Sequence, residues 1–348
     1  MRRIYMYMIV TGFVIIIFNA CKQDTQIVSP YDFYVSVPQT NYKVGDTVRF
    51  QLSGNYGGYI TFYSGEIGRN YANANRTSQA GVNKLVFQTS MQQGAVPPAA
   101  SLDSLKLMIS TNLAGYDSAS IAKATWVDIT ARNTKWPTSL ATTYTTSDSV
   151  DVSDFNTAQQ VNFAFHYIGK STTVAQRKYE IQNLTLSNNL PDGTNTPLFS
   201  APFLGNTTIS GSTIAPASSF AYTGWVECSF KNRATTAWNV GTANVNGGTT
   251  LLNSSGIAIR TSYPITFDPS AVVGVPANDA WLITSAVDLK TVKPDAGIYI
   301  QDELTPSPLT GYNYVFKTHG TYLVTFVASN SNSTTSAQVI KQITLTVQ

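Results

Sequence analysis

Apolar and polar residues alternate along most of this chain in short runs that predict β-strands. Val48, Phe50 and Leu52, for example, alternate with polar neighbours. Runs of the same kind cover residues 48–52, 105–109, 161–167, 322–328 and 343–347. Because successive side chains of a strand point to opposite faces, a period of two predicts a strand with one face in the core.

The segments between these runs are rich in Gly, Asn, Asp, Pro and Ser, which are turn residues. No stretch sustains a period of 3.6 residues with capping residues at its ends, so no helix is predicted. Many short strands without interleaved helices favour antiparallel sandwiches over a parallel α/β sheet. The predicted fold class is therefore all-β.

The start of the chain has the features of an exported, lipid-modified protein. Two arginines precede an apolar run at residues 9–18, which is shorter than the roughly 20 residues of a membrane-spanning helix. The small residue Ala20 stands just before Cys21, as a cleavage site requires. We expect residues 1–20 to be a signal peptide, Cys21 to carry the lipid, and residues 21–30 to form a tether. The alternative is an uncleaved anchor helix with an incidental cysteine.

Composition and charge describe a neutral, hydroxyl-rich surface. Only 12% of the residues are charged, against 43% that are apolar, and the formal net charge is +3. Nucleic-acid binders show a basic patch or stripe, whereas these Lys and Arg residues are scattered singly, so no nucleic-acid partner is expected. Cys228 is the only cysteine besides Cys21, and its setting in an alternating run predicts a small buried strand residue.

Residues suited to catalysis are few. The chain has two histidines, His166 and His319, and it lacks the zinc-protease, Cys-x-x-Cys, phosphate-loop and nucleophile-elbow motifs. Glycoside hydrolysis needs two carboxylates about 5 to 10 Å apart, and Glu66 is the glutamate that lies in a turn beside an aromatic residue. We expect no enzymatic activity; a hydrolase that uses Glu66 is the weaker alternative.

Asp148, Asp151 and Asp154 lie close together in the sequence and could contribute to a structural calcium site, because calcium takes carboxylate oxygens from loops. The spacing is not that of an EF-hand, and a solvated loop is the other interpretation. No other cofactor is expected. Asp-Ser-aliphatic triplets around Ser118 and Ser149 match the O-glycosylation pattern of exported Bacteroidetes proteins.

Aromatic residues in polar loops are candidates for sugar binding. Sugars present apolar faces edged by hydroxyl groups, so a site needs flat rings with amide or hydroxyl partners nearby. Trp136 follows Asn133 in a loop marked by proline, and Trp238 precedes Asn239 in a similar setting. We expect these four residues to bind a neutral glycan; burial of the rings in the core is the alternative.

Two parts of the chain look like halves of one domain. The run Val44-Gly45-Asp46-Thr47-Val48-Arg49-Phe50, in residues 31–76, resembles the opening strands of a PKD-type immunoglobulin-like domain. Residues 300–348 are similar to its closing strands. We expect the two halves to form one sandwich with residues 83–290 inserted. The alternative is a separate C-terminal domain with its own early strands between residues 265 and 300.

The inserted region, with runs such as Tyr179-Glu180-Ile181-Gln182-Asn183-Leu184, resembles jelly-roll modules of bacterial cleaved-adhesin and carbohydrate-binding proteins. The mature chain as a whole resembles the Bacteroidetes lipoproteins grouped as domain of unknown function family 5017. That resemblance implies partnership with SusC/SusD-type glycan uptake systems.

These observations predict a lipid-anchored outer-membrane protein at the cell surface that binds a neutral polysaccharide or oligosaccharide without catalysis. An adhesion or transporter-docking interaction protein is the alternative function. The sequence leaves open which glycan is bound, which leaflet holds the lipid and what the oligomeric state is.

Overall fold

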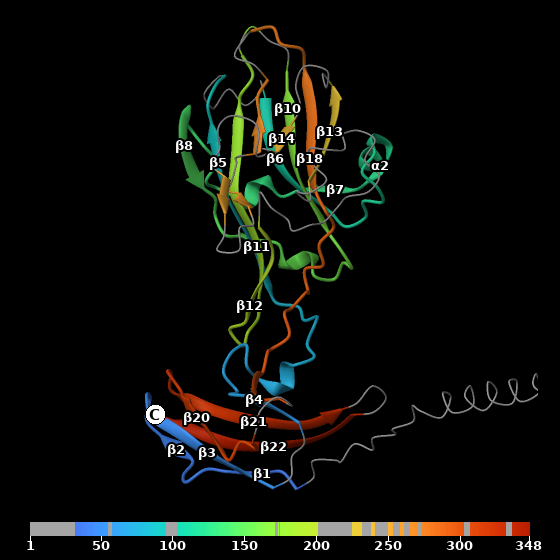
Figure 1. Cartoon of the computed structure of the whole chain (residues 1–348). Coiled ribbons are helices and arrows are strands. Elements are labelled where there is room, and N and C mark those ends of the chain that lie inside the picture. Colours follow the sequence, from blue (N-terminus) through green and yellow to red (C-terminus); the bar gives the residue numbers. More distant parts are fainter. Residues whose placement is uncertain are drawn as a thin grey trace, which may run out of the picture. The chain divides into compact units, whose positions relative to one another are not determined.

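The fold is nearly all β, which confirms the predicted class. The computed structural model describes residues 32–54, 58–94, 103–170, 173, 175–200, 225–231, 238–240, 250–252, 258–260, 265–269, 273–302, 307–331 and 336–348. These residues divide into two compact units (Figure 1). Unit 1 takes its residues from the part of the chain up to Asn75 and from Pro294 onward, and unit 2 is the stretch from Arg76 to Lys293.

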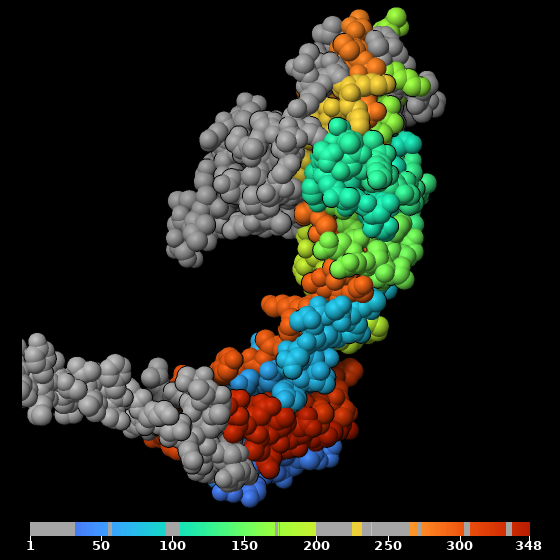
Figure 2. Space-filling view, turned by 90° about the vertical axis from the view of Figure 1, so that its right-hand side faces the viewer, coloured from blue at the N-terminus to red at the C-terminus, as the bar shows by residue number. Residues whose placement is uncertain are grey.

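Unit 1 is built from strands of both chain segments. Its elements are β1 (Tyr34–Ser36), β2 (Asn41–Tyr42), β3 (Thr47–Ser53), β4 (Tyr59–Tyr63), η1 (Tyr71–Asn73), β19 (Ile298–Gln301), β20 (Gly311–Val315), β21 (Gly320–Ser331) and β22 (Ser336–Val347). They form a three-stranded sheet, β1-β3-β20, and a five-stranded sheet, β19-β4-β21-β22-β2. Figure 2 shows the blue N-terminal residues against the red C-terminal ones in this unit. Each sheet therefore depends on strands from both segments.

The core of unit 1 lies between its two sheets. Strand β3 alternates buried and exposed residues as predicted, with Val48, Phe50 and Leu52 directed inward. The Phe50 ring lies 5.0 Å from that of Phe326 on β21 and 5.7 Å from that of Phe62 on β4, measured between centroids. The two sheets are antiparallel except where β2 pairs with β22, and because they bury alternate side chains against each other they make a sandwich.

Unit 2 holds most of the strands. Its elements are β5 (Val82–Met91), β6 (Asp103–Ser110), α2 (Ser118–Lys123), β7 (Trp126–Asp128), η2 (Thr130–Arg132), β8 (Ala141–Thr146), β9 (Val150–Asp151), η3 (Ser153–Phe155), β10 (Asn162–Gly169), β11 (Tyr179–Asn189), β12 (Asn195–Ser200), β13 (Trp225–Lys231), β14 (Trp238–Val240), β15 (Thr250–Leu252), β16 (Ala258–Arg260), β17 (Ile265–Phe267) and β18 (Asn278–Thr284). A five-stranded sheet has the order β13-β18-β10-β6-β7. A seven-stranded sheet has the order β14-β17-β11-β5-β8, with β12 on β11 and β9 on β5.

The inner faces of these two sheets share one large core. Phe87 on β5 meets Phe165 on β10 edge to face, with ring centroids 5.5 Å apart. Trp225 on β13 is fully buried in the same cluster. The alternation seen in the sequence thus marks the side chains that join the sheets.

Helix α2 corrects the expectation that the chain has no helix. Asp117 caps it, because its Oδ1 accepts a hydrogen bond from the Ser120 backbone N–H at 2.9 Å. Six residues are too few to show a helical period, which explains why the pattern gave no signal. Ile121 of this helix joins a small cluster with Ala164 and Trp281 on the outer side of the five-stranded sheet.

Candidate functional site

Trp238 is a core residue and not an exposed platform. Its side chain is 2% exposed, and its Nε1–H donates to the carbonyl oxygen of Ala280 at 3.2 Å. The ring packs 5.2 Å from that of Phe267 on the neighbouring strand. A buried ring cannot stack on a sugar, so the expected role of Trp238 is wrong. The backbone of Asn239 belongs to β14, but its side chain lies outside the described residues.

Trp136 is half-buried, and its ring also packs against the core. Its ring lies 5.5 Å from that of Phe87, and its Nε1–H donates to the carbonyl oxygen of Thr130 at 3.1 Å. Asn133 is 2% exposed and uses its Oδ1 to accept from the backbone N–H groups of Lys135 and Asp148. These contacts fold the loop onto the sheet, so the pair expected to hold a sugar stabilises the loop.

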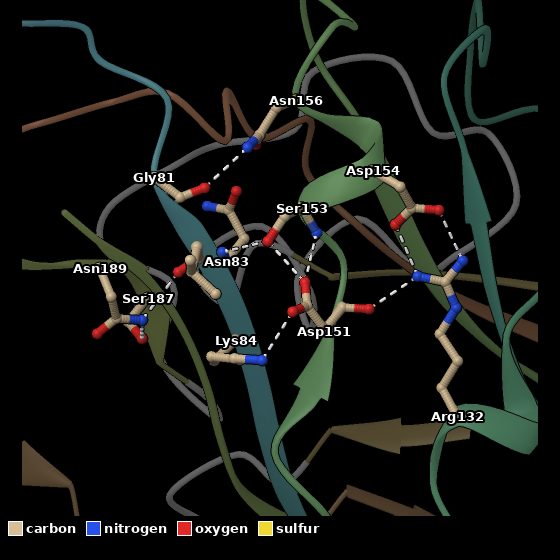
Figure 3. Close-up of polar contacts among 11 residues, drawn as sticks. Gly81, Asn83, Lys84, Arg132, Asp151, Ser153, Asp154, Asn156, Ser187 and Asn189 are labelled. Atoms are coloured by element: carbon tan, nitrogen blue, oxygen red, sulfur yellow. Dashed lines mark hydrogen bonds and ion pairs between the residues drawn. The ribbon is translucent and has the colours of Figure 1, made fainter. Parts of the chain in front are cut away.

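The carboxylates of Asp151 and Asp154 are each paired with a different cation (Figure 3). Arg132 forms two parallel hydrogen bonds to Asp154, both 2.7 Å long. Lys84 Nζ lies 2.7 Å from Asp151 Oδ2, while Asp151 Oδ1 accepts from the Ser153 hydroxyl. Lys84 and Ser153 together lower the pKa of Asp151 to about 2.

The Asp148 carboxylate binds partners other than those of Asp151 and Asp154. Its Oδ2 accepts from the backbone N–H and the hydroxyl of Thr134, both at 2.7 Å, and Lys135 Nζ lies 3.1 Å from its Oδ1. These groups lower the pKa of Asp148 to about 2. Within the described residues, no group of three or more His, Cys, Asp or Glu side chains could hold a metal ion. The calcium candidate formed by Asp148, Asp151 and Asp154 is therefore wrong, because its carboxylates point to separate partners.

Ser118 and Ser149, the two expected glycosylation positions, are both exposed. Ser118 begins helix α2, and Ser149 lies between β8 and β9. Cys21 and residues 1–20 lie outside the described residues. No helix among the residues that the structure describes is both long and apolar enough to cross a membrane.

The candidate catalytic residues have structural contacts. The carboxylate of Glu66 accepts hydrogen bonds from the Tyr314 phenol at 2.6 Å and from the Ser64 hydroxyl at 2.8 Å. The Nε2 atom of His166 lies 2.8 Å from Asp279 Oδ1. These bonds hold turns and strands in place.

A surface that the sequence analysis missed lies on the outer face of the seven-stranded sheet, where β8, β5 and β11 are neighbours (Figure 1). Three amides meet there. The Oε1 atom of Gln88 accepts from Gln182 Nε2 at 3.0 Å and from Asn183 Nδ2 at 2.8 Å, and Gln88 Nε2 donates to Thr146 Oγ1 at 3.1 Å. We call Gln88, Tyr144, Gln182 and Asn183 the amide surface.

A β-bulge creates this convergence. The pairing of β11 with β5 shifts between Gln182 and Thr185, so that one extra residue of β11 fits between paired positions. Asn183 has φ +50°, the only positive value of a non-glycine residue in the described part of the chain. The bulge lets Gln182 and Asn183, which are consecutive, reach the same carbonyl oxygen, whereas consecutive residues of a regular strand face opposite sides.

Charged groups beside the amide surface are paired with one another. The Tyr144 phenol donates to Glu180 Oε2 at 2.7 Å, and Lys178 Nζ lies 3.3 Å from Glu180 Oε1 and 3.5 Å from Asp268 Oδ2. Burial and the bond to Glu180 both raise the pKa of Tyr144, so its hydroxyl stays protonated. The arrangement offers neutral donors and acceptors next to an ion network whose members bind each other.

The sequence contains a signal for this surface. In the run from Tyr179 to Leu186, the apolar positions Ile181 and Leu184 are three apart instead of two, which is the mark of an extra residue in the strand. The partners Gln88 and Tyr144 lie on strands far away in the sequence, so their convergence could not be read from spacing.

Comparison with protein-family models finds a match over the first half of the chain. A model of a domain of unknown function, DUF5017, matches residues 20–204. No curated protein matches the chain, and no solved structure does. The matched residues include β5, β8 and β11, and therefore the whole amide surface.

Proposed function

Because the chain belongs to the DUF5017 family and the matched residues carry the amide surface, we propose that this surface binds a neutral glycan without cleaving it. The observation that carries the proposal is the convergence of Gln182 and Asn183 on Gln88 Oε1. Sugar hydroxyls both donate and accept hydrogen bonds, and a side-chain amide does both without a net charge.

The donors and acceptors that remain on these amides suit such a ligand. Among the hydrogen bonds of the described residues, Gln182 and Asn183 each use one N–H toward Gln88. Each amide has a second N–H and a carbonyl oxygen that a sugar can engage. The mutual bonds also fix the side chains before binding, which reduces the conformational entropy lost on association.

The neighbouring ion network supports a neutral ligand over an acidic one. Glu180 and Asp268 place carboxylates near the amides, and these would repel an anionic sugar. Lys178 is held by both carboxylates, so it contributes little attraction to an anion. Tyr144 adds a protonated phenol and an aromatic ring beside the amides, the combination that sugar faces require.

The proposal also covers the location of the protein and its partners. Cleavage after residue 20 and lipid attachment at Cys21 would anchor the chain at the outer membrane, at the cell surface of a Bacteroidetes bacterium. A SusC/SusD-type transporter would then receive the captured polysaccharide or oligosaccharide. In this proposal unit 1 is a PKD-type immunoglobulin-like sandwich and unit 2 a jelly-roll-like module inserted into it. Ser118 and Ser149 would be O-glycosylated.

Gels that contain neutral polysaccharides test the binding proposal. Purified full-length protein should be retarded by at least one member of a broad panel, and no reducing ends should be released. Asn183→Gly removes the amide but keeps the backbone conformation, since glycine adopts positive φ readily. Loss of about two hydrogen bonds should weaken binding roughly five- to thirtyfold.

The control variant is Asn195→Ala, which removes an exposed amide on β12 away from the amide surface. It should bind like the unmodified protein. Retardation by none of the polysaccharides would refute the proposal, and co-purification with an outer-membrane partner in that case would favour an adhesion or docking protein. Radiolabelled fatty acid should be incorporated into the protein but not into Cys21→Ser.

A further inference from the structure

Tyr299 is the most exposed large apolar side chain among the described residues, at 77%. It lies on β19, at one edge of the five-stranded sheet of unit 1. Its neighbours Ile298 and Ile300 pack against the core of the unit, so strand alternation directs the Tyr299 ring outward.

Two more tyrosines lie next to it on the same outer face. Tyr299 pairs with Thr61, and Tyr63 follows on the same side of β4. The Tyr63 ring lies 5.3 Å from that of Tyr71 in η1, with the planes 71° apart. Burial raises the pKa of Tyr63, and the phenols of Tyr299 and Tyr71 raise it further. We call Tyr63, Tyr71 and Tyr299 the tyrosine surface.

The backbone beneath these rings is packed closely. A Cβ atom added to Gly297 would lie 2.3 Å from Thr61 Cγ2 and 2.8 Å from the Tyr63 ring. Glycine at this position therefore lets β19 approach β4 and keeps the Tyr63 ring in place. The Tyr63 ring is thus packed against the chain before any ligand arrives, which lowers the entropic cost of binding.

Charged groups near the tyrosine surface already have partners within unit 1. Asp295 Oδ2 accepts from the Asn70 backbone N–H at 2.8 Å, and Arg69 Nη1 donates to the Ala296 carbonyl oxygen at 3.3 Å. What remains for a ligand is an exposed ring with phenol groups beside it. A ring with an apolar face and a hydroxyl at its edge matches the apolar face and hydroxyl rim of a pyranose.

We infer that the tyrosine surface is a second glycan-binding site, in which Tyr299 stacks on a sugar ring and the Tyr63 and Tyr71 phenols bond to its hydroxyls. The inference rests on the proposed function and extends it to unit 1. The amide surface belongs to unit 2 and the tyrosine surface to unit 1, so the two are separate sites. Tyr63 and Tyr71 lie within residues 20–204, the part that matches the family, whereas Tyr299 lies beyond it.

The test compares Tyr299→Ala with Tyr34→Ala in polysaccharide gels. Tyr34 is also exposed in unit 1, at 57%, but it lies on β1 of the other sheet, with Lys341 Nζ 5.4 Å from its ring centroid. With the polysaccharide that retards the unmodified protein most, Tyr299→Ala should bind at least fivefold more weakly. Tyr34→Ala should bind normally. Both variants change exposed side chains, so their thermal midpoints should match that of the unmodified protein.

Protection from acetylation gives a measurement that needs no variant. N-acetylimidazole should modify Tyr299 and Tyr34 in the free protein, and the bound polysaccharide should slow modification of Tyr299 but not of Tyr34, as mapped by mass spectrometry of peptides. Unchanged binding by Tyr299→Ala, together with weaker binding by Asn183→Gly, would overturn this inference and leave the proposed function intact. Absence of binding by the unmodified protein would overturn both.

Discussion

The imidazole of His166 lies flat on the indole of Trp281, with ring centroids 3.8 Å apart and planes 17° apart. The two residues are paired across β10 and β18 on the outer face of the five-stranded sheet of unit 2. Asp279, two residues before Trp281, contacts the edge of the imidazole at Nε2. The histidine is thus fixed by a ring and a carboxylate, and it is 9% exposed.

Replacing His166 by Ala should destabilise unit 2 by about 1–3 kcal/mol, because the Trp281 face loses its partner and Asp279 loses a hydrogen bond. Tryptophan fluorescence during urea unfolding measures this loss, since all five tryptophans of the chain lie in unit 2. His166→Gln keeps a hydrogen-bond donor and should lose less. Glycan binding should persist in both variants at urea concentrations where they stay folded; loss of binding by the folded variants would contradict a purely structural role.

Trp238→Ala should cost unit 2 about 3–5 kcal/mol, the range for a large aromatic residue removed from a core. Trp238→Phe fills most of the space and loses chiefly the bond to the Ala280 carbonyl oxygen, so a loss of about 1–2 kcal/mol is expected. Urea unfolding, monitored by circular dichroism, distinguishes the stability losses of Trp238→Ala and Trp238→Phe. If the Trp238→Ala protein were stable but failed to bind glycan, the Trp238 ring would have a role in binding and not only in the core.

The ion pairs around Asp148 and Asp151 predict how unit 2 responds to acid. The pKa values of both carboxyls are lowered to about 2, whereas an unfolded Asp titrates near 3.9. Their contribution to stability is therefore complete above about pH 5 and is lost as the pH falls toward 2. The urea midpoint, followed by tryptophan fluorescence, should fall over that interval.

Asp151→Asn provides the comparison, because it removes one of the titrating groups. Its urea midpoint should depend less steeply on pH between 5 and 2 than that of the unmodified protein. At neutral pH the change should be within about 1 kcal/mol, because the Lys84–Asp151 pair is exposed and such pairs contribute little. Equal slopes for the two proteins would show that Asp151 is not among the groups that respond to acid.

The bulge at Asn183 predicts opposite effects of two substitutions. Asn183→Gly should keep or slightly raise the free energy of unfolding, because glycine tolerates φ +50°. Asn183→Val should lower it by about 1–3 kcal/mol, since a β-branched residue is strained there. Urea unfolding measures both. A stable valine variant would mean that the strand can shift its register and lose the bulge.

Alternation predicted the parts of the fold that depend on neighbouring residues. It placed Val48, Phe50 and Leu52 in the core, where they lie. The same alternation places Tyr299, between Ile298 and Ile300, on the outer face of its strand, although the predicted sugar-binding rings were both tryptophans.

Partners distant in the sequence explain the errors at the candidate sites. Asp154 is neutralised by Arg132, and Asp151 by Lys84, which belong to other elements of unit 2. Trp238 is buried by Phe267 and the strand of Ala280. Spacing within one loop cannot reveal contacts that only the sheet order creates.

The two chain segments that connect unit 2 to unit 1 bear on the order in which the chain folds. Within unit 2, Val292 donates its backbone N–H to the Thr77 carbonyl oxygen at 3.0 Å, and Ser78 forms a bridge with Thr291. Once unit 2 has folded, it holds the two connections to unit 1 side by side and acts as a short turn. The entropy of closing a long loop is then already lost, so β3 can find β20 as readily as in a hairpin. Synthesis must reach β20 before that sheet closes, so all of unit 2 is made before the sheet can form.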